Sequence, residues 1–154
     1  MMDLKNGILD VHGFLLTKDT KLSDFYGLPA EDVKIKTTER GNTYIDFLHS
    51  LHSNGIDVTV EISFYKGSSS PKITLWPAVP SELRGKYVDI TKYRVEASKK
   101  WLKGLIDTEP TVSTSSSVYY EFEGVEYLSL ARKDPHYGLV GGEIEVTFRE
   151  AKSQ

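Results

Sequence analysis

Residues 54–65 read Asn-Gly-Ile-Asp-Val-Thr-Val-Glu-Ile-Ser-Phe-Tyr, and this stretch predicts the fold. Asn54-Gly55 is a strong signal of a β-hairpin, because both residues tolerate the positive φ angles of a two-residue turn. Apolar residues then alternate with polar ones from Ile56 to Phe64, which is the period of a strand with one buried face. We therefore expect a hairpin whose second arm begins directly after Gly55.

The arm before this turn, residues 43–53, carries two periodicities. It is rich in residues that favour strands. Its apolar side chains also fit a helical stripe: Tyr44, Phe47, Leu48 and Leu51. The hairpin turn that follows favours the strand, and a helix remains the alternative for this segment.

Working outward, the same β-rich patterns predict further strands at 8–16, 33–38, 72–76, 118–123, 125–131 and 143–148. Serine, proline and glycine predict connecting loops at 66–71, 77–85, 111–117 and 132–142. A short helix is expected to run toward Tyr26, with Thr20 or Ser23 as its N-cap.

One long helix is expected over residues 91–107. Its apolar stripe follows helical spacing: Tyr93, Ala97, Trp101 and Leu105. Thr91 is the expected N-cap, with Ile90 and Val95 placed as a hydrophobic staple. Because the strands meet through hairpins, we predict an α+β fold. In it, a mostly antiparallel sheet packs against this helix and the short N-terminal helix in a single domain, 1–154.

The composition excludes several classes of protein. The chain has 154 residues, 39% hydrophobic, with no cysteine and a formal net charge of −3. No disulfide framework or cysteine metal site can form, and no window approaches the roughly 18 apolar residues of a membrane span. The N-terminus lacks a secretory signal, so we expect a cytoplasmic protein without membrane contact. The net charge argues against nucleic-acid binding, and Lys92, Lys99 and Lys103 are interpreted as the solvated side of the helix.

The histidines do not complete a recognisable site. His49 and His52, three apart on a strand, would point to opposite faces, so no metal site and no cofactor are expected. Asp10 with His12, or Asp134 with His136, could pair an orienting carboxylate with a general base, yet no nucleophile motif accompanies either pair.

The segment around Asp134 reads more simply as a turn, and the glycines that follow it precede a strand. Residues 138–142 are glycine-rich, but a phosphate cradle needs glycines that lead into a helix N-terminus. The sequence therefore predicts no nucleotide binding by that route.

The last strands carry an acidic bias. Residues 118–150 contain seven acids and three bases. The period of a strand places several glutamates and one tyrosine away from the apolar set: Tyr119, Glu121, Glu123, Glu143 and Glu145. Carboxylates with a tyrosine suit a surface that steers and anchors a basic partner, and the five basic residues of helix 91–107 make the charge asymmetry sharper.

We interpret the chain as a non-enzymatic protein-binding module, monomeric or homodimeric. In size and build it resembles small bacterial cytoplasmic immunity proteins, which shield a cell from a secreted toxin domain by plugging its site. The resemblance covers the whole chain without a shared motif, and it implies an inhibited partner such as a basic toxin domain. The alternative is an enzyme or small-ligand-binding domain with a pocket between the helix and the sheet. Its candidate residues are Tyr93, Trp101, Tyr120, Asp134 and His136.

Overall fold

The computed structural model describes residues 2–149. Its one long helix is α1 (Tyr87–Leu105), and three short 3-10 helices are η1 (Leu4–Asn6), η2 (Leu22–Phe25) and η3 (Ser81–Leu83). The strands are β1 (Leu9–Val11), β2 (Phe14–Leu16), β3 (Val33–Thr37), β4 (Thr43–Phe47), β5 (Leu51–Ser53), β6 (Ile56–Phe64), β7 (Lys72–Pro77), β8 (Val112–Thr114), β9 (Ser117–Phe122), β10 (Val125–Asp134) and β11 (Gly138–Phe148).

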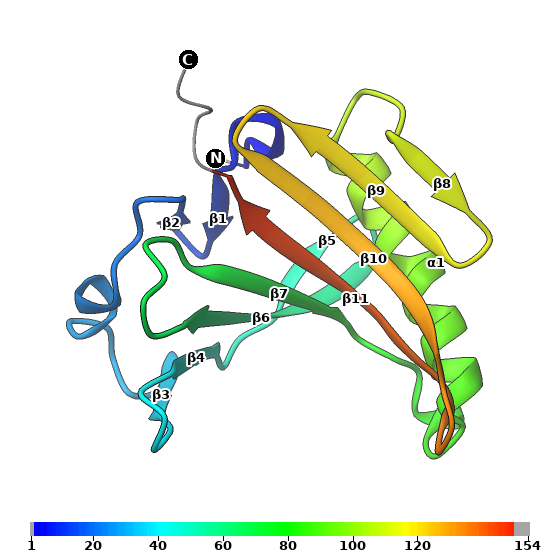
Figure 1. Cartoon of the computed structure of the whole chain (residues 1–154), viewed down its shortest axis with the longest axis horizontal. Helices are drawn as coiled ribbons and strands as arrows, with labels where there is room; N and C mark the ends of the chain where they lie inside the picture. Colours follow the sequence, from blue (N-terminus) through cyan, green and yellow to red (C-terminus); the bar gives the residue numbers. More distant parts are fainter. Residues whose placement is uncertain (1, 150–154) are drawn as a thin grey trace.

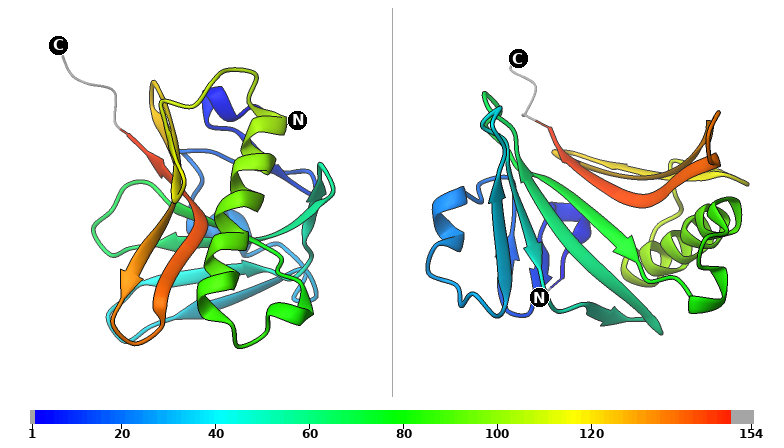
Figure 2. Two further views of the ribbon diagram at one scale, coloured as in Figure 1. Left: turned by 90° about the vertical axis from the view of Figure 1, so that its right-hand side faces the viewer. Right: turned by 90° about the horizontal axis from the view of Figure 1, so that it is seen from below.

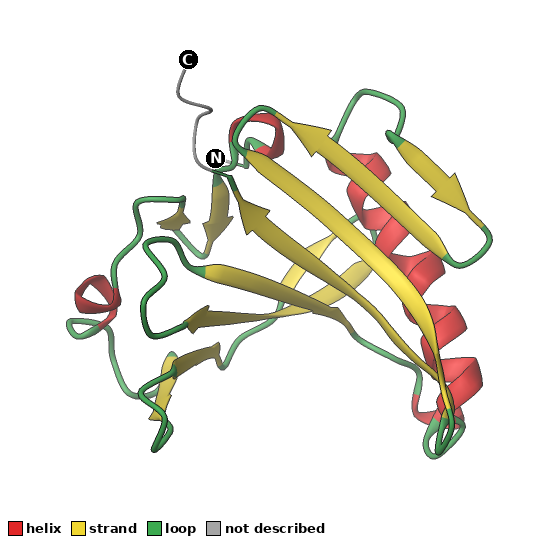
Figure 3. Cartoon of the chain, in the orientation of Figure 1, coloured by secondary structure: helices red, strands yellow, loops and turns green. Residues whose placement is uncertain are grey.

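Nine of the strands form one antiparallel sheet in the order β3-β4-β6-β7-β11-β10-β9-β8, with β5 paired to the other end of β6 (Figure 1). The helix runs along one side of this sheet, as the colouring by secondary structure in Figure 3 shows. Figure 2 shows the strong twist that turns β9–β11 away from the direction of β3 and β4. The expected α+β class is confirmed.

The hairpin at Asn54-Gly55 is confirmed, and the strand interpretation of residues 43–53 is correct. Ser53 pairs with Ile56, and both turn residues have positive φ, 54° and 73°. The arm is split into β4 and β5 by residues 48–50, so the two short strands pair with opposite ends of β6. Of the apolar residues that fitted a helical stripe, Tyr44 and Phe47 lie in β4 and Leu51 in β5, whereas Leu48 lies between the two strands and is exposed.

The expected single strand over 8–16 is wrong, because it is a separate hairpin of β1 and β2. His12 and Gly13 form its two-residue turn, with φ of 54° and 89°, and Asp10 Oδ1 accepts the Gly13 backbone N–H at 2.7 Å. Positive φ at both positions is the geometry of a type I′ turn, which Asn-Gly signals and His-Gly does not. The short helix that follows is the 3-10 turn η2, which begins after Lys21 rather than after Thr20 or Ser23.

Two expected loops contain strands. Residues 132–142 extend β10 and β11 into one long hairpin that turns between Asp134 and Gly138. Within it, Ser129 pairs with Ile144 and Ala131 with Gly141, so two residues of β11 face one of β10 in a β-bulge. Residues 112–114 form the edge strand β8. Glycine in a strand usually weakens it, which is why the pattern predicted a loop at 132–142, whereas the serine-rich composition predicted the loop at 111–117.

The helix begins four residues before its expected start and ends at Leu105. Thr91 lies inside α1, not at its N-cap, and its Oγ1 donates to the carbonyl oxygen of either Tyr87 (3.0 Å) or Leu139 of β11 (3.1 Å). The expected staple between Ile90 and Val95 therefore does not exist at the helix start. A hydroxyl bound to a strand carbonyl explains why a residue that is favoured at N-caps lies within the helix.

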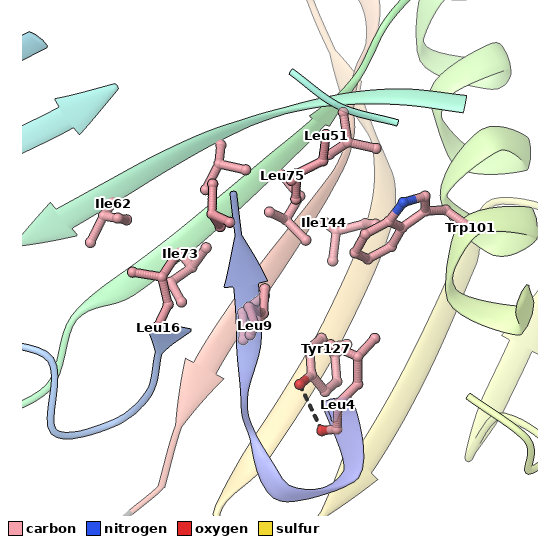
Figure 4. Close-up of a cluster of buried hydrophobic side chains, with 14 of the residues drawn as sticks. Leu4, Leu9, Leu16, Leu51, Ile62, Ile73, Leu75, Trp101, Tyr127 and Ile144 are labelled. Carbon is pink, nitrogen blue, oxygen red and sulfur yellow. Dashed lines mark hydrogen bonds between the residues drawn. The ribbon is translucent and has the colours of Figure 1, made fainter. Parts of the chain in front are cut away.

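The core lies on the sheet face that α1 covers, which we call the inner face. Trp101 of α1 is fully buried against it, as expected, together with Leu75 and Ile144 (Figure 4). The N-terminal hairpin covers the same face next to the helix, and Leu9 and Leu16 are fully buried there. All elements that bury the sheet thus lie on one side of it.

Candidate functional site

The opposite face of the sheet, which we call the outer face, is not covered by α1 or by the N-terminal hairpin, and most of its side chains are partly exposed. Its central row takes one residue from each strand of the sheet path, as the cross-strand register shows: Lys34, Asp46, Glu61, Thr74, Glu145, Leu128, Tyr119 and Val112. In Figure 1 the outer face of β9, β10 and β11 points toward the viewer, with α1 behind it. The row divides into a half with three carboxylates and a half with apolar and aromatic side chains.

Tyr119 and Glu121 occupy the positions that the strand period predicts, and they belong to a hydrogen-bonded network. The Tyr119 hydroxyl donates to Glu126 Oε2 at 2.5 Å, which raises the pKa of the tyrosine. Arg149, just after β11, forms ion pairs with Glu121 and Glu126 and donates to the Tyr119 hydroxyl at 2.9 Å. Sequence reasoning missed Glu126 and Arg149, because their roles depend on the register of three strands.

The other three glutamates differ in their surroundings. Glu145 lies in the central row, where Lys72 Nζ approaches it at 3.4 Å. Glu143 lies at the β-bulge with only 12% of its side chain exposed, 4.0 Å from Arg132. Glu123 is exposed in the β9–β10 turn. Basic residues of the chain thus offset part of the negative charge of residues 118–149. Glu150 lies outside the described residues.

A carboxylate pair on the outer face was missed by sequence reasoning. Asp46 of β4 and Glu61 of β6 are directly opposite each other across the strands. Partial burial together with the nearby charge and hydrogen bonding of Asp46 raises the pKa of Glu61. Like charges directly opposite in a sheet are destabilising, and Lys34, opposite Asp46 on its other side, is the only basic residue next to the pair in this row. A positive group from outside the chain would reduce the remaining repulsion at Glu61.

The residues of the alternative pocket are not gathered in one place. Trp101 is fully buried in the core, whereas Tyr93 is 40% exposed. Asp134 Oδ1 accepts the backbone N–H groups of His136 and Tyr137, both at 2.8 Å, so its role is to cap the β10–β11 turn. His136 is exposed, with its ring centroid 4.5 Å from that of Tyr137.

The histidines pair with different carboxylates. His49 Nε2 lies 3.3 Å from Asp32, and His52 Nδ1 lies 2.6 Å from Asp57. His12 Nε2 contacts the carbonyl oxygen of His49 at 3.2 Å, and Asp10 Oδ1 accepts the backbone N–H of Gly13 in the same turn. Among residues 2–149, no group of three or more histidine and acidic side chains is arranged to hold a metal ion.

No helix in the described part of the chain has the length and apolar character needed to cross a membrane. Comparison of the chain with models of known protein families, with curated proteins and with solved structures gives no match.

Proposed function

We propose that this chain is a non-enzymatic protein-binding module that binds a basic partner protein through its outer face. The observation that carries the proposal is the central row, which crosses the open face of the sheet with carboxylates on one half and apolar groups on the other. Complementary charge steers a partner and sets its orientation, whereas buried aromatic and apolar contacts supply most of the affinity.

The two halves of the row would make different contacts. Asp46 and Glu61 present a carboxylate pair whose mutual repulsion a lysine or arginine of the partner would relieve. On the other half, Tyr119 lies beside Leu128, and Val112 on the edge strand is 49% exposed. An apolar side chain of the partner would cover these groups, and the polar network around Arg149 would form the rim.

The finer form of the proposal is a cytoplasmic immunity protein. The partner would be a basic toxin domain, and binding would neutralise it by covering its site. The supporting features are the acidic bias of the outer face and the resemblance in size and build to small immunity proteins.

Two triple variants with equal changes of net charge test the proposal. One removes the three carboxylates of the central row: Asp46→Asn, Glu61→Gln and Glu145→Gln. The control removes exposed carboxylates elsewhere: Glu31→Gln, Glu39→Gln and Glu82→Gln. Affinity capture from a lysate of the source cells should recover a stoichiometric partner with the wild type and the control, and about tenfold less with the outer-face variant.

Carbodiimide labelling of carboxyl groups then locates the interface. In the complex, Glu61 and Glu145 should be protected from labelling, and Glu39 should not. Equal capture by both variants would contradict the proposal. For the finer form, co-expression with the captured partner should suppress its toxicity, and the outer-face variant should fail to do so.

A further inference from the structure

A cleft of about 310 Å³ lies between the first turns of α1 and the first residues of β11. Aromatic and aliphatic side chains make up most of its wall, including Trp76, Tyr87, Tyr137 and Leu139. Its charged groups are Arg94, Arg132 and Glu143. Small-molecule sites are concave, largely apolar and carry a few convergent polar groups, and this volume is near the lower end of their range.

Arg94 of α1 is the least satisfied of these groups. Its guanidinium carbon lies 5.3 Å from the centroid of the Trp76 ring. Its Nε is buried and has no hydrogen-bond partner among residues 2–149. Burial also lowers the pKa of this side chain. A cation that has lost water without gaining a partner for every donor costs free energy, and a bound anion would recover it.

Two guanidinium groups share a single carboxylate in this cleft. Glu143 acts electrostatically on Arg94, and its Oε1 lies 4.0 Å from Arg132 Nη2, which is longer than a hydrogen bond. The wall of the cleft therefore carries one more positive charge than negative charge. Arginine is the residue best suited to hold a planar carboxylate or a phosphate, because its parallel N–H groups match two oxygens.

The β-bulge holds this arrangement in place. Ser98 of α1 and Ser129 of β10 both donate to the carbonyl oxygen of Gly142, at 2.7 and 2.8 Å. These bonds join the helix to both strands of the hairpin at Gly142, the residue next to Glu143 in the bulge. Bulges of this kind occur next to functional sites, where they re-aim a side chain.

The mouth of the cleft is aromatic. The rings of Tyr87 and Tyr137 lie 4.7 Å apart, and both residues are exposed, by 53% and 43%. Exposed tyrosines next to a half-buried cation suit a ligand that has a flat apolar body and a charged end.

We propose that this cleft binds a small organic anion, with a carboxylate or phosphate held by Arg94 and Arg132 and a flat apolar body against Tyr87 and Tyr137. The site is separate in its chemistry from the outer face, because its attraction is for negative charge, and it needs no protein partner. Gly141 and Gly142, which lie beside the site, have the positive φ angles of the β-bulge and do not form a phosphate-binding loop.

The experiment is calorimetric titration of the purified chain with benzoate and with phenyl phosphate, which distinguish a carboxylate ligand from a phosphate ligand. We expect saturable one-site binding of at least one of the two probes. Arg94→Lys keeps the charge but removes Nε and the paired donors, and Arg132→Gln removes the second cation. Each change should weaken binding about tenfold or more.

Arg40→Gln, in the exposed turn between β3 and β4, is the matched control and should bind as the wild type does. The side chain of Arg132 is 60% exposed, so its variant should fold even if the Arg94 variant does not. The Arg94 Nε–H signal in ¹⁵N NMR should also move on binding. The proposal is overturned if neither probe binds, or if Arg132→Gln binds as tightly as Arg40→Gln.

Discussion

At the scale of single residues, Glu61 combines a cost in stability with the binding role that we propose for it. Its carboxylate is partly buried opposite Asp46, and both effects raise its pKa. In the free protein at neutral pH this pair is destabilising, and a bound basic group would remove the penalty. Surfaces that bind partners commonly carry such unfavourable groups, because selection acts on the complex.

Glu61→Gln should stabilise the free protein at pH 7 by about 0.5 kcal/mol, the scale of one cross-strand pair. A raised pKa means that the folded state binds its proton at a higher pH than the unfolded chain. The gain should therefore be largest at neutral pH and disappear below about pH 4, where both states are protonated. Urea unfolding at pH 7 and pH 4 measures this, with Glu39→Gln as an exposed control. A loss of stability at pH 7 would refute the assignment.

His12 is a residue whose backbone, more than its side chain, matters for the fold. Its φ of 54° is the same as that of Asn54, and both residues begin a two-residue turn before glycine. We expect His12→Asn to leave stability unchanged within a few tenths of a kcal/mol, and His12→Val to lower it by about 1–2 kcal/mol. Both changes remove the imidazole, so the difference in unfolding free energy between the two variants measures the cost of the positive φ angle for a branched residue. Equal stabilities would show that the turn tolerates a branched residue.

At the scale of elements, the close approach of β11 to α1 depends on Gly142. A Cβ atom at this position would lie 2.6 Å from Cβ of Arg94 and 2.9 Å from the carbonyl oxygen of Thr91. Glycine patterns predicted a loop here, whereas the structure uses the missing side chain to bring a bulged strand against the helix. Strand alternation cannot reveal this, because the bulge changes which residues face the core.

Gly142→Ala and Gly124→Ala separate the two costs of adding a side chain. The two glycines have nearly equal φ, 89° and 88°, but a Cβ at Gly124 has no neighbour within 4 Å. Gly124→Ala should cost about 1–2 kcal/mol from the backbone alone, and Gly142→Ala about 1–3 kcal/mol more from the clash. Thermal or urea unfolding of both variants measures the difference. Equal losses would mean that α1 moves away without cost.

At the scale of the whole molecule, the N-terminal segment is part of the core. The buried hydroxyl of Tyr127 on β10 donates to the carbonyl oxygen of Leu4 at 2.7 Å, as the dashed line in Figure 4 shows. Leu9 and Leu16 of the adjoining hairpin are fully buried on the same face. One bond between residues 123 positions apart thus connects the start of the chain to its last hairpin.

Tyr127→Phe should destabilise the protein by about 0.5–1.5 kcal/mol, because it removes one of the two hydrogen bonds to the Leu4 carbonyl oxygen and leaves only the one from the Gly7 backbone N–H. Burial raises the pKa of Tyr127 in the folded state. The unfolded chain therefore releases this proton first, and stability should fall as pH rises through about 10, less steeply in the variant. Urea unfolding across this pH range tests both effects. Tyr26→Phe, at a residue that is 66% exposed, should change stability by less than about 0.5 kcal/mol.

The amino-acid sequence by itself determined the α+β class, the hairpin at Asn54-Gly55, the amphipathic helix through Trp101 and the outward position of Tyr119 and Glu121. These features depend on local periodicity and turn chemistry, which act over a few residues. Only the tertiary structure decided that Asp46 faces Glu61, that Arg149 neutralises Glu121, and that the Arg94 guanidinium lies over the Trp76 ring. Such contacts arise from strand register and helix packing between distant segments, and no short-range pattern encodes them.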